Sequence, residues 1–205
     1  MTPEELAPHF ASWGSNVDVG SNVRFIHPEK IHVGDNVSIQ DMAYLDATYG
    51  KEIRLENNCR IARFSQLICS GFGFDDGFIW LKQGSRTGLF NVLNGHAGLT
   101  IGENVMIAPQ CSLNGFKHTF DRVDIPMNAQ PEIANPITIE DDVYIATGAL
   151  VMGVRIGHGS VIGAHALVTR DVPPYSIVMG VPGRVVGNRL DKSRHAQLLA
   201  DNAAE

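Results

Sequence analysis

A histidine in a long irregular segment is the side chain of this chain best suited to proton transfer. His118 stands in Asn114-Gly-Phe-Lys-His-Thr-Phe-Asp121, and Asp121 follows it three residues later. Histidine titrates near neutral pH, so it can take a proton from a hydroxyl group as that group reacts. A carboxylate beside the ring could orient it, although Asp is also common in loops for local hydrogen bonding. From the residues alone, a histidine on a surface loop is the ordinary interpretation of His118.

A second group of residues that could do chemistry lies toward the C-terminus. Arg170 and Arg184 carry guanidinium groups, which can bind a phosphate with two parallel hydrogen bonds. Taken alone, two such arginines are more typical of a solvated surface. Five further histidines could suggest a metal site: His27, His32, His96, His158 and His165. They are scattered along the sequence, so separate surface or corner positions are favoured for them.

The composition excludes several classes of protein. The 205 residues include 16 basic and 22 acidic side chains, which gives a net charge of −6. General binding to nucleic acid or a membrane surface favours a basic excess, so neither partner is expected. Hydrophobic residues make up 44% of the chain and charged residues 19%, which excludes a disordered protein. No apolar run approaches the roughly 18 residues of a membrane span, so no membrane insertion is expected.

The cysteines and the N-terminal residues indicate a reducing compartment. Cys59, Cys69 and Cys111 form no C-x-x-C pair, so they predict neither a disulfide framework nor a zinc site. Small buried thiols are expected instead. The first six residues, Met1-Thr-Pro-Glu-Glu-Leu6, lack the apolar core of a signal peptide. A cytoplasmic location is the resulting expectation.

The elements that must position these side chains are indicated by a six-residue repeat. A large aliphatic residue recurs every six positions, and a small or apolar one often follows four positions later, as at Val37 and Cys59. The aliphatic positions form five triplets: Val33/Ile39/Leu45, Leu55/Ile61/Leu67, Ile101/Ile107/Leu113, Ile139/Ile145/Val151 and Ile156/Ile162/Val168.

A period of six is not helical and fits short strands joined by tight corners. Three hexads make one triangular coil of a parallel β-solenoid, in which each inward aliphatic residue stacks on the next coil. An all-β fold is therefore predicted, with a β-sandwich of short strands as the alternative. The spacing does not give the handedness of the coil, and ordinary parallel crossovers are right-handed.

The repeat is interrupted in two places. Its register is lost between Leu67 and Ile101, which predicts insertions near 71–98. Between Leu113 and Ile139 the chain makes a long excursion, which predicts a loop protruding near 114–136. Long ordered loops in compact domains are usually functional.

The two ends differ from the repeat. Thr2 and Pro3 suit the N-cap and first turn of a short helix that covers the first coil. The predicted organisation is a helical cap at 1–16, a solenoid domain at 17–187 and a C-terminal tail at 188–205. The tail is polar and Ala-rich, so a helix that frays at its end is expected there.

Several stretches together resemble the hexapeptide-repeat acyltransferases, the family of the maltose, galactoside and nodulation-factor O-acetyltransferases. The stretches are Ile101-Gly-Glu-Asn-Val-Met-Ile-Ala-Pro109, Ile139-Glu-Asp-Asp-Val-Tyr-Ile-Ala-Thr147, Val154-Arg-Ile-Gly-His-Gly-Ser-Val-Ile-Gly-Ala164, Leu167-Val-Thr-Arg-Asp-Val-Pro-Pro-Tyr175 and Val178-Met-Gly-Val-Pro-Gly-Arg184. The resemblance covers residues 90–187 well and residues 17–70 only as generic hexads. It implies a left-handed parallel β-helix, a homotrimer with an active site between neighbouring subunits, and acetyl-CoA as acyl donor.

The resemblance also implies roles for particular residues. His118 stands at the place of the family's catalytic histidine. Asn91 resembles the asparagine that faces the acceptor, where an amide could stabilise a developing oxyanion. The loop from Asn91 to Ile101 is one residue shorter than in the family. Coenzyme contacts are implied for Thr147, Ala164, Thr169, Arg170 and Arg184.

One basic position of the family is missing. In the family, a further basic residue often stands three positions after the one that Arg184 matches. Here that position holds Gly187, and Arg189 is the candidate to replace the basic residue.

The function implied is acetyl-CoA-dependent O-acetylation of a sugar or glycan-precursor hydroxyl, by direct attack with His118 as general base. No Cys or Ser is placed beside His118 as an obvious covalent nucleophile, and no metal is expected. N-acetylation of an amino sugar and acetylation of a xenobiotic alcohol are alternatives for the same site. Two other classes stay open: a zinc-dependent solenoid like the γ-class carbonic anhydrases, and a non-catalytic solenoid scaffold.

Overall fold

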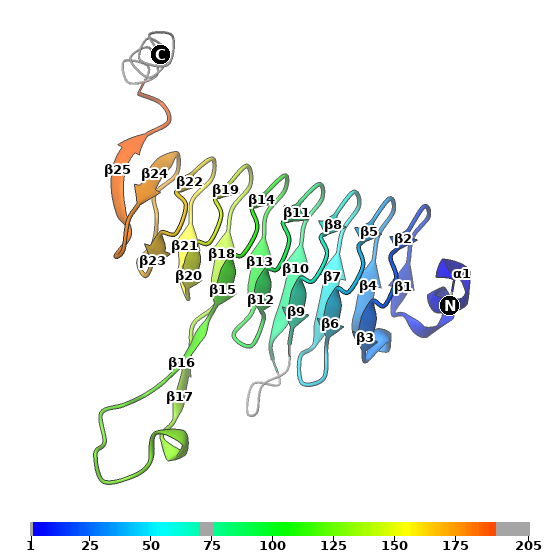
Figure 1. Ribbon diagram of the computed structural model, residues 1–205, viewed down its shortest axis with the longest axis horizontal. Coiled ribbons are helices and arrows are strands. Elements are labelled where there is room, and N and C mark those ends of the chain that lie inside the picture. The colour runs from blue at the N-terminus through cyan, green and yellow to red at the C-terminus, as the bar shows by residue number, and fades with distance from the viewer. Residues whose placement is uncertain (1, 70–75, 192–205) are drawn as a thin grey trace.

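Short strands wind into a column of stacked coils, in which each coil adds one strand to each of three sheets (Figure 1). The structure is a computed structural model that describes residues 2–69 and 76–191. The strands of the first sheet are β1 (Ser12–Trp13), β4 (Ile31–Val33), β7 (Glu52–Leu55), β10 (Phe78–Leu81), β13 (Leu99–Ile101), β18 (Ile137–Ile139) and β21 (Arg155–Ile156).

The other two sheets are built in the same way. The second contains β2 (Asp18–Val19), β5 (Ser38–Ile39), β8 (Arg60–Ile61), β11 (Arg86–Thr87), β14 (Met106–Ile107), β19 (Tyr144–Ile145), β22 (Val161–Ile162), β24 (Ser176–Met179) and β25 (Arg184–Asn188). The third contains β3 (Arg24–Ile26), β6 (Tyr44–Asp46), β9 (Gln66–Ile68), β12 (Val92–Asn94), β15 (Ser112–Asn114), β20 (Leu150–Met152) and β23 (Leu167–Val168). Successive coils pair in parallel, and only the terminal pair β24–β25 of these sheets is antiparallel. This is a parallel β-helix and not a β-sandwich.

The core is the inside of the column. All fifteen aliphatic residues of the five sequence triplets lie there, and none of them is more than 3% exposed. Parallel pairing places them in register, as in Leu45 beside Leu67 and Leu113 beside Val151. Each such side chain contributes on the order of 1.5–3 kcal/mol when fully buried. The six-residue period therefore predicted both the strands and the face that each strand buries.

Residues 78–98 form a regular coil, although the sequence predicted insertions near 71–98. Thr87 takes the inward position and is 5% exposed, with its Cα paired to Ile107. Its Oγ1 accepts a hydrogen bond from the backbone N–H of Ala62 at 2.9 Å, which satisfies the buried hydroxyl. A polar residue at an aliphatic position hid this coil from the pattern. The insertion before β10 is correspondingly shorter, and residues 70–75 lie outside the described part of the chain.

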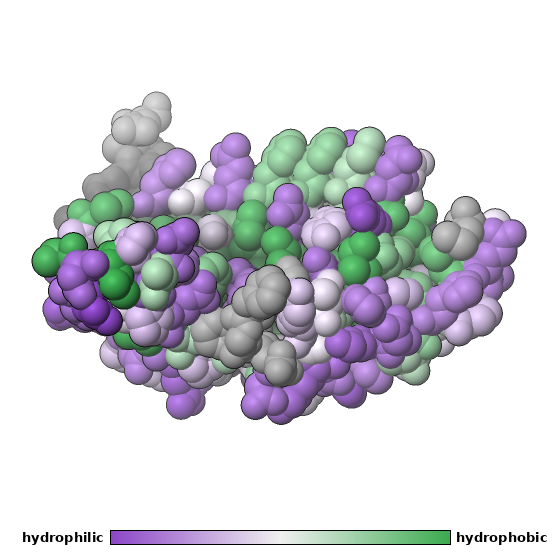
Figure 2. Space-filling model, turned by 90° about the horizontal axis from the view of Figure 1, so that it is seen from below, coloured by the Kyte–Doolittle hydropathy of each residue, from purple (hydrophilic) through white to green (hydrophobic). Residues whose placement is uncertain are grey.

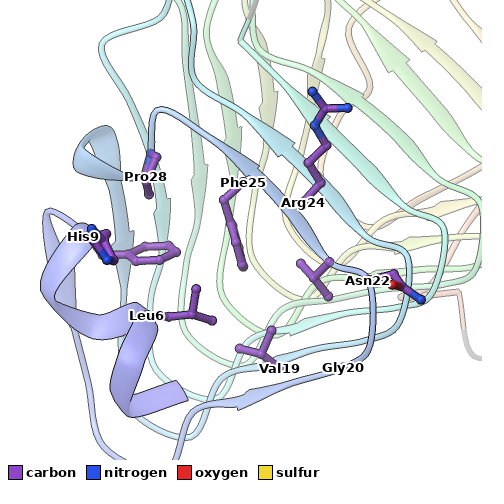
Figure 3. Close-up of a pocket in the computed structure, with 10 residues that line it drawn as sticks. Leu6, His9, Val19, Gly20, Asn22, Arg24, Phe25 and Pro28 are labelled. Carbon is purple, nitrogen blue, oxygen red and sulfur yellow. The ribbon is translucent and has the colours of Figure 1, made fainter. Parts of the chain in front are cut away.

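The N-terminal residues cover the first coil. Helix α1 (Pro3–Leu6) is capped by Thr2, whose Oγ1 accepts from the backbone N–H of Glu5 at 3.4 Å, as the sequence predicted. The 3₁₀ helix η1 (Ala7–His9) follows it. Between these turns and the first coil lies a hollow of about 670 Å³, into which Leu6, Val19 and Phe25 point (Figure 3). It is the open end of the core column.

The boundaries at both ends differ from the predicted ones. Strand β1 already joins the first sheet, so the solenoid begins before residue 17. At the other end β25 continues the second sheet to Asn188. The helix predicted within 188–205 falls from residue 192 onward outside the described residues. Within the described ranges no helix is long and apolar enough to cross a membrane.

Candidate functional site

In the described part of the chain, the connections vary in length at one corner, where the third sheet passes to the first. The other two corners have four residues in each coil from β1 to β23. At the variable corner the lengths run from two residues between β20 and β21, through the 3₁₀ turn η2 (Pro28–Lys30), to a hairpin between β15 and β18. The hairpin consists of β16 (Phe116–His118) and β17 (Glu132–Ala134), and it projects well away from the column (Figure 1).

The hairpin places His118 opposite a carboxylate. His118 and Glu132 are direct cross-strand partners, so their side chains lie on the same face of the two-stranded ribbon. His118 Nε2 is 3.3 Å from Glu132 Oε1. A carboxylate at this position can hold the imidazole in one orientation. Nδ1 of His118 forms no hydrogen bond with any described residue.

The loop beyond these strands is closed by polar contacts of its own. Gln130 is buried; its Nε2 donates to the backbone oxygen of Arg122 at 2.8 Å, and its Oε1 accepts from the backbone N–H of Arg122 at 3.2 Å. Thr119 N and Oγ1 both donate to the backbone oxygen of Pro131. The 3₁₀ helix η3 (Met127–Ala129) completes the loop. His118 therefore stands on an ordered support.

Asp121 does not take the role considered for it. It is exposed in the loop and makes no hydrogen bond or ion pair with His118 within the described residues. The carboxylate beside the ring is Glu132, fourteen residues from His118 in sequence. Spacing could not reveal this partner, because antiparallel pairing across a loop of undetermined register decides which acid faces the histidine.

A hollow opens next to His118. It has a volume of about 310 Å³ and is lined by His118, Thr119, Phe120, Met127 and Asn128. Phe120 and Met127 are both more than 60% exposed. Apolar side chains beside an imidazole offer a surface against which the flat face of an acceptor molecule can pack.

Asn91 lies inside the column and does not face an acceptor. It is fully buried, and its Oδ1 accepts a hydrogen bond from the backbone N–H of Cys111 at 2.9 Å. Its Nδ2 has no hydrogen-bond partner. Asn91 stands four residues after Thr87, which is the inward corner position that Ser65 and Cys111 fill in neighbouring coils. The prediction that its amide stabilises an oxyanion is therefore wrong.

Two other asparagines stand at the corner where the hairpin leaves. Asn94 and Asn114 end β12 and β15, and each accepts a hydrogen bond at Oδ1 from the backbone N–H two residues later. These amides were missed, although Asn-Gly occurs at 94–95 and again twenty residues later at 114–115. The repeated Asn-Gly pair was the sequence feature that could have indicated these two turns.

The residues expected at the coenzyme lie along two margins of the third sheet. Thr147 and Ala164 occupy the same corner in successive coils, before β20 and β23. The turn that precedes Arg184 lies over β23, because Gly183 N donates to the backbone oxygen of Leu167 at 2.7 Å. Thr169 and Arg170 follow β23 at the opposite margin. A single chain therefore does not gather these five residues into one cluster.

Polar groups and cations are available at both margins. Thr169 lines a cavity of about 250 Å³ at the base of the hairpin, together with Lys117 and Asn135. Arg170 and Arg184 are exposed, and Arg184 donates to the neighbouring backbone oxygen of Gly183 at 2.9 Å. Neither arginine has a carboxylate partner in the described part of the chain.

Arg189 does not replace the basic residue missing at Gly187. Its guanidinium is 3.3 Å from Asp142 and donates to the backbone oxygen of Gly159. Both partners belong to the corner between the first and second sheets, away from Arg184.

The cysteines are buried, as predicted from their scattered positions. Burial raises the pKa of the Cys59 and Cys69 thiols to about 12, so neither supplies a thiolate at neutral pH. Within residues 2–69 and 76–191 no group of three or more His, Cys, Asp or Glu side chains is arranged to hold a metal ion.

Comparison with known proteins relates the chain to acetyltransferases. It is 38% identical over 100 residues to a probable acetyltransferase of Mycobacterium tuberculosis, which covers 48% of this chain and 33% of the relative. Identity to the serine acetyltransferase of Bacillus subtilis is 35%, over 61% of this chain and 62% of the relative. Identity to the galactoside O-acetyltransferase of Escherichia coli is 39%, over 47% of each. The chain thus spans from a third to about three-fifths of these relatives.

The fold is shared with solved structures. The crystal structure of AntD, an N-acyltransferase from Bacillus cereus in complex with dTDP and 3-hydroxybutyryl-CoA, matches with a TM-score of 0.63. The match covers 100% of this chain and 97% of AntD at 19% sequence identity, so it concerns the fold alone. No family model matches the chain. Together the relatives and the parallel β-helix confirm the resemblance to the hexapeptide-repeat acetyltransferases.

Proposed function

We propose that this chain is an acyltransferase that moves an acetyl group from acetyl-CoA to a hydroxyl group, with His118 as general base. The observation that carries the proposal is the 3.3 Å contact between His118 Nε2 and Glu132 Oε1 on an exposed hairpin. An imidazole held by a carboxylate, with no hydrogen bond from a described residue to its second nitrogen, is the arrangement that proton abstraction from a hydroxyl needs. The acetyltransferase relatives supply the class of reaction.

The proton path follows from the tautomer. His118 Nε2 lies 3.3 Å from Glu132 Oε1. With the proton on Nε2, facing the carboxylate, the lone pair of Nδ1 is left for the acceptor hydroxyl. As the hydroxyl oxygen bonds to the acetyl carbonyl carbon, Nδ1 takes the hydroxyl proton. The carbon–sulfur bond of the thioester then breaks, and the imidazolium returns its proton to the sulfur. Glu132 stabilises the charged ring between the two transfers.

The residues at the margins of the third sheet fit the donor. Coenzyme A carries several phosphate charges, and a phosphate needs cations that are not already neutralised. Arg170 and Arg184 meet that need, because both are exposed without a carboxylate partner among the described residues. Thr147, Ala164 and Thr169 are at corners, where backbone groups are accessible to the coenzyme arm. The donor site is proposed to need both margins, and hence two neighbouring subunits.

The left-handed coil and the homotrimer are part of the proposal. An exposed aromatic pair supports self-association: the rings of Phe64 and Phe90 stack with centroids 4.9 Å apart and planes at 5°. Both residues have φ of +59°, which is rare for a bulky side chain and costs energy. Figure 2 shows apolar side chains gathered along one long edge of the column. A partner subunit over Phe64 and Phe90 would cover rings that otherwise face water.

The proposed acceptor is a hydroxyl of a sugar or a glycan precursor. The galactoside O-acetyltransferase among the relatives supports this choice, and the hollow beside His118 offers Phe120 to the apolar face of a sugar ring. Serine must also be tested as an acceptor, because one relative is a serine acetyltransferase. N-acetylation of an amino sugar is the second candidate for the same site.

Calorimetric titration with acetyl-CoA tests the donor site without a choice of acceptor. Binding near one site per chain is expected, weakened at least tenfold by dephospho-CoA or by Arg170→Ala with Arg184→Ala, since a charge-assisted pair contributes about 1.5–3 kcal/mol. Arg122→Ala is the matched control, because that arginine pairs with Asp124 in the loop. Absence of acetyl-CoA binding would contradict the proposal.

A second assay identifies the acceptor. Release of the coenzyme thiol is followed with simple sugars, amino sugars and serine at equal concentration. Turnover with sugar hydroxyls above the other acceptors is expected. Faster turnover with an amino sugar would identify an amine, and not a hydroxyl, as the acceptor group.

A further inference from the structure

Among the described residues, the hairpin that bears His118 meets the column at its base (Figure 1). A two-stranded ribbon is marginally stable by itself in water, so its direction depends on contacts near the points where it leaves the column. One contact is the hydrogen bond from Asn135 N to the backbone oxygen of Gly115 at 2.6 Å. The second is a ring contact between Phe116, the first residue of β16, and His96 of the preceding coil.

That ring contact follows from a repeated local sequence. Asn94-Gly95-His96 and Asn114-Gly115-Phe116 occupy equivalent places in successive coils, because β12 and β15 pair with Leu93 opposite Leu113. Each asparagine turns the chain by accepting from the backbone N–H two residues later, at 3.0 Å for His96 and 3.2 Å for Phe116. Identical turns stack, and so do the rings that follow them: the centroids are 4.8 Å apart and the planes meet at 31°.

His96 is firmly held by its own coil. The residue is 9% exposed. Its Nδ1 faces Asn94 Oδ1, which also accepts from the backbone N–H of His96 and is thereby identified as the oxygen of the amide. An amide oxygen only accepts, so Nδ1 carries the proton. The imidazole is thus fixed in tautomer and in orientation, and it presents a rigid face to Phe116.

The contact bears directly on His118. Residues two apart in a strand project to the same face, so Phe116 and His118 lie on one side of β16, about 7 Å apart along the strand. A small rotation at the base displaces the end of a ribbon by more than it displaces the base. We propose that His96 is a positioning residue, which fixes the direction of the hairpin through Phe116 and so places the His118–Glu132 pair. Its kinetic consequence rests on the proposed acetyl transfer.

Five variants test this proposal, the fifth being His96→Gln, which keeps a polar nitrogen without the ring. His96→Ala removes the ring, and Phe116→Ala removes its partner. His96→Phe keeps an aromatic face but loses the hydrogen bond to Asn94. His158→Ala is the matched control, because the His158 ring packs edge-on against Tyr175 with centroids 5.3 Å apart at a different corner of the column.

The kinetic readout separates positioning from participation in the chemistry. His96→Ala and Phe116→Ala are expected to lower kcat about tenfold or more while KM for acetyl-CoA and the shape of the pH profile stay unchanged. His96→Phe is expected to restore kcat to within about threefold, and His158→Ala to leave it unchanged. Restoration by His96→Gln in place of His96→Phe would overturn the proposal, because a nitrogen and not the ring face would then be the required group.

A second readout does not depend on activity. The bond after Lys117 lies within β16, whose backbone is paired with β17, so trypsin reaches it only when the ribbon opens. Tryptic cleavage at this bond is expected to be about fivefold faster in His96→Ala and Phe116→Ala, and unchanged in His96→Phe and His158→Ala. An unchanged rate in both alanine variants would overturn the proposal. If the unmodified chain transferred no acetyl group, the proposed function would fail and cleavage alone would decide the role of His96.

Discussion

His118 and Glu132 face each other across the two strands of the hairpin, with Nε2 and Oε1 3.3 Å apart. His118 was predicted from its resemblance to a family position, and Glu132 is brought to it by strand register. Because the pair projects from the column, the proposed function has it meet a donor at the coils and an acceptor from solvent at the same time.

Replacing the carboxylate tests what the pair does. Glu132→Gln keeps the size of the side chain but cannot stabilise an imidazolium, so kcat is expected to fall about 10- to 100-fold. Acetyl-CoA binding, measured by calorimetry, should be unaffected. Asp121→Asn is the matched control, since that acid makes no contact with His118, and it should keep at least half of the activity. The opposite ranking of the two variants would transfer the role to Asp121.

Asn91 is expected to matter for stability and not for turnover. Asn91→Ala removes the acceptor of the Cys111 backbone N–H in the core, a loss of about 1–3 kcal/mol. Thermal unfolding should therefore begin several degrees lower. At a temperature where the variant is folded, kcat should remain within about threefold of the unmodified chain. A large loss of kcat at full stability would reinstate the amide as part of the active site.

Much of the fold could be predicted because one physical requirement repeats. A column of stacked coils needs an aliphatic residue at each inward position, so Val33, Ile101 and Ile156 could be placed from spacing alone. Thr87 escaped the pattern because its hydroxyl finds a backbone donor inside the core. The insertions predicted near 71–98 followed in part from that single polar residue.

The candidate site was less accessible to sequence reasoning. His118 was predicted as the base because its position resembles that of the family's catalytic histidine. Glu132 was not found, because the register of an antiparallel ribbon depends on the folded loop between its strands. Asn91 was assigned to the acceptor site because the six-residue repeat could not be followed through its coil. Without the repeat, the sequence did not show that Asn91 takes an inward corner position.

The aromatic pair on the column predicts the assembly. Phe64→Ser combined with Phe90→Ser removes the stacked rings at two corners whose backbone already has positive φ. Sedimentation velocity is expected to show a trimer for the unmodified chain and a monomer for the double variant. Met106→Ser, an exposed apolar residue of β14, is the control and should remain trimeric. Persistence of the trimer in the double variant would place the interface elsewhere.

Glu140 predicts an acid-sensitive contact between two successive coils. It accepts from the backbone N–H of His158 at 2.6 Å and from Arg155 Nε at 2.6 Å. These bonds, the first being the larger cause, hold the pKa of Glu140 below its ordinary value of 4.5. A lowered pKa in the folded state means that the ionised group stabilises the fold above pH 4.5 and that this stability is lost as the pH falls through the lowered pKa.

Thermal unfolding at several pH values measures that contribution. Glu140→Gln should unfold at a lower temperature than the unmodified chain at pH 7, and the difference should shrink as the pH falls below about 4. Glu103→Gln is the control, because Glu103 is exposed and its carboxylate forms no hydrogen bond or ion pair with any described residue. A difference between Glu140→Gln and the unmodified chain that does not vary with pH would show that the carboxylate charge does not stabilise the coils.

The role of His118 is tested most directly by coupling a binding measurement with a rate measurement on one variant. His118→Ala is expected to bind acetyl-CoA as the unmodified chain does, with thermal unfolding unchanged, because the side chain is half exposed and outside the core. Its rate of acetyl transfer should fall at least about 100-fold, the contribution of a positioned general base. A variant that binds acetyl-CoA and keeps most of its kcat would contradict the assignment of His118 as the base.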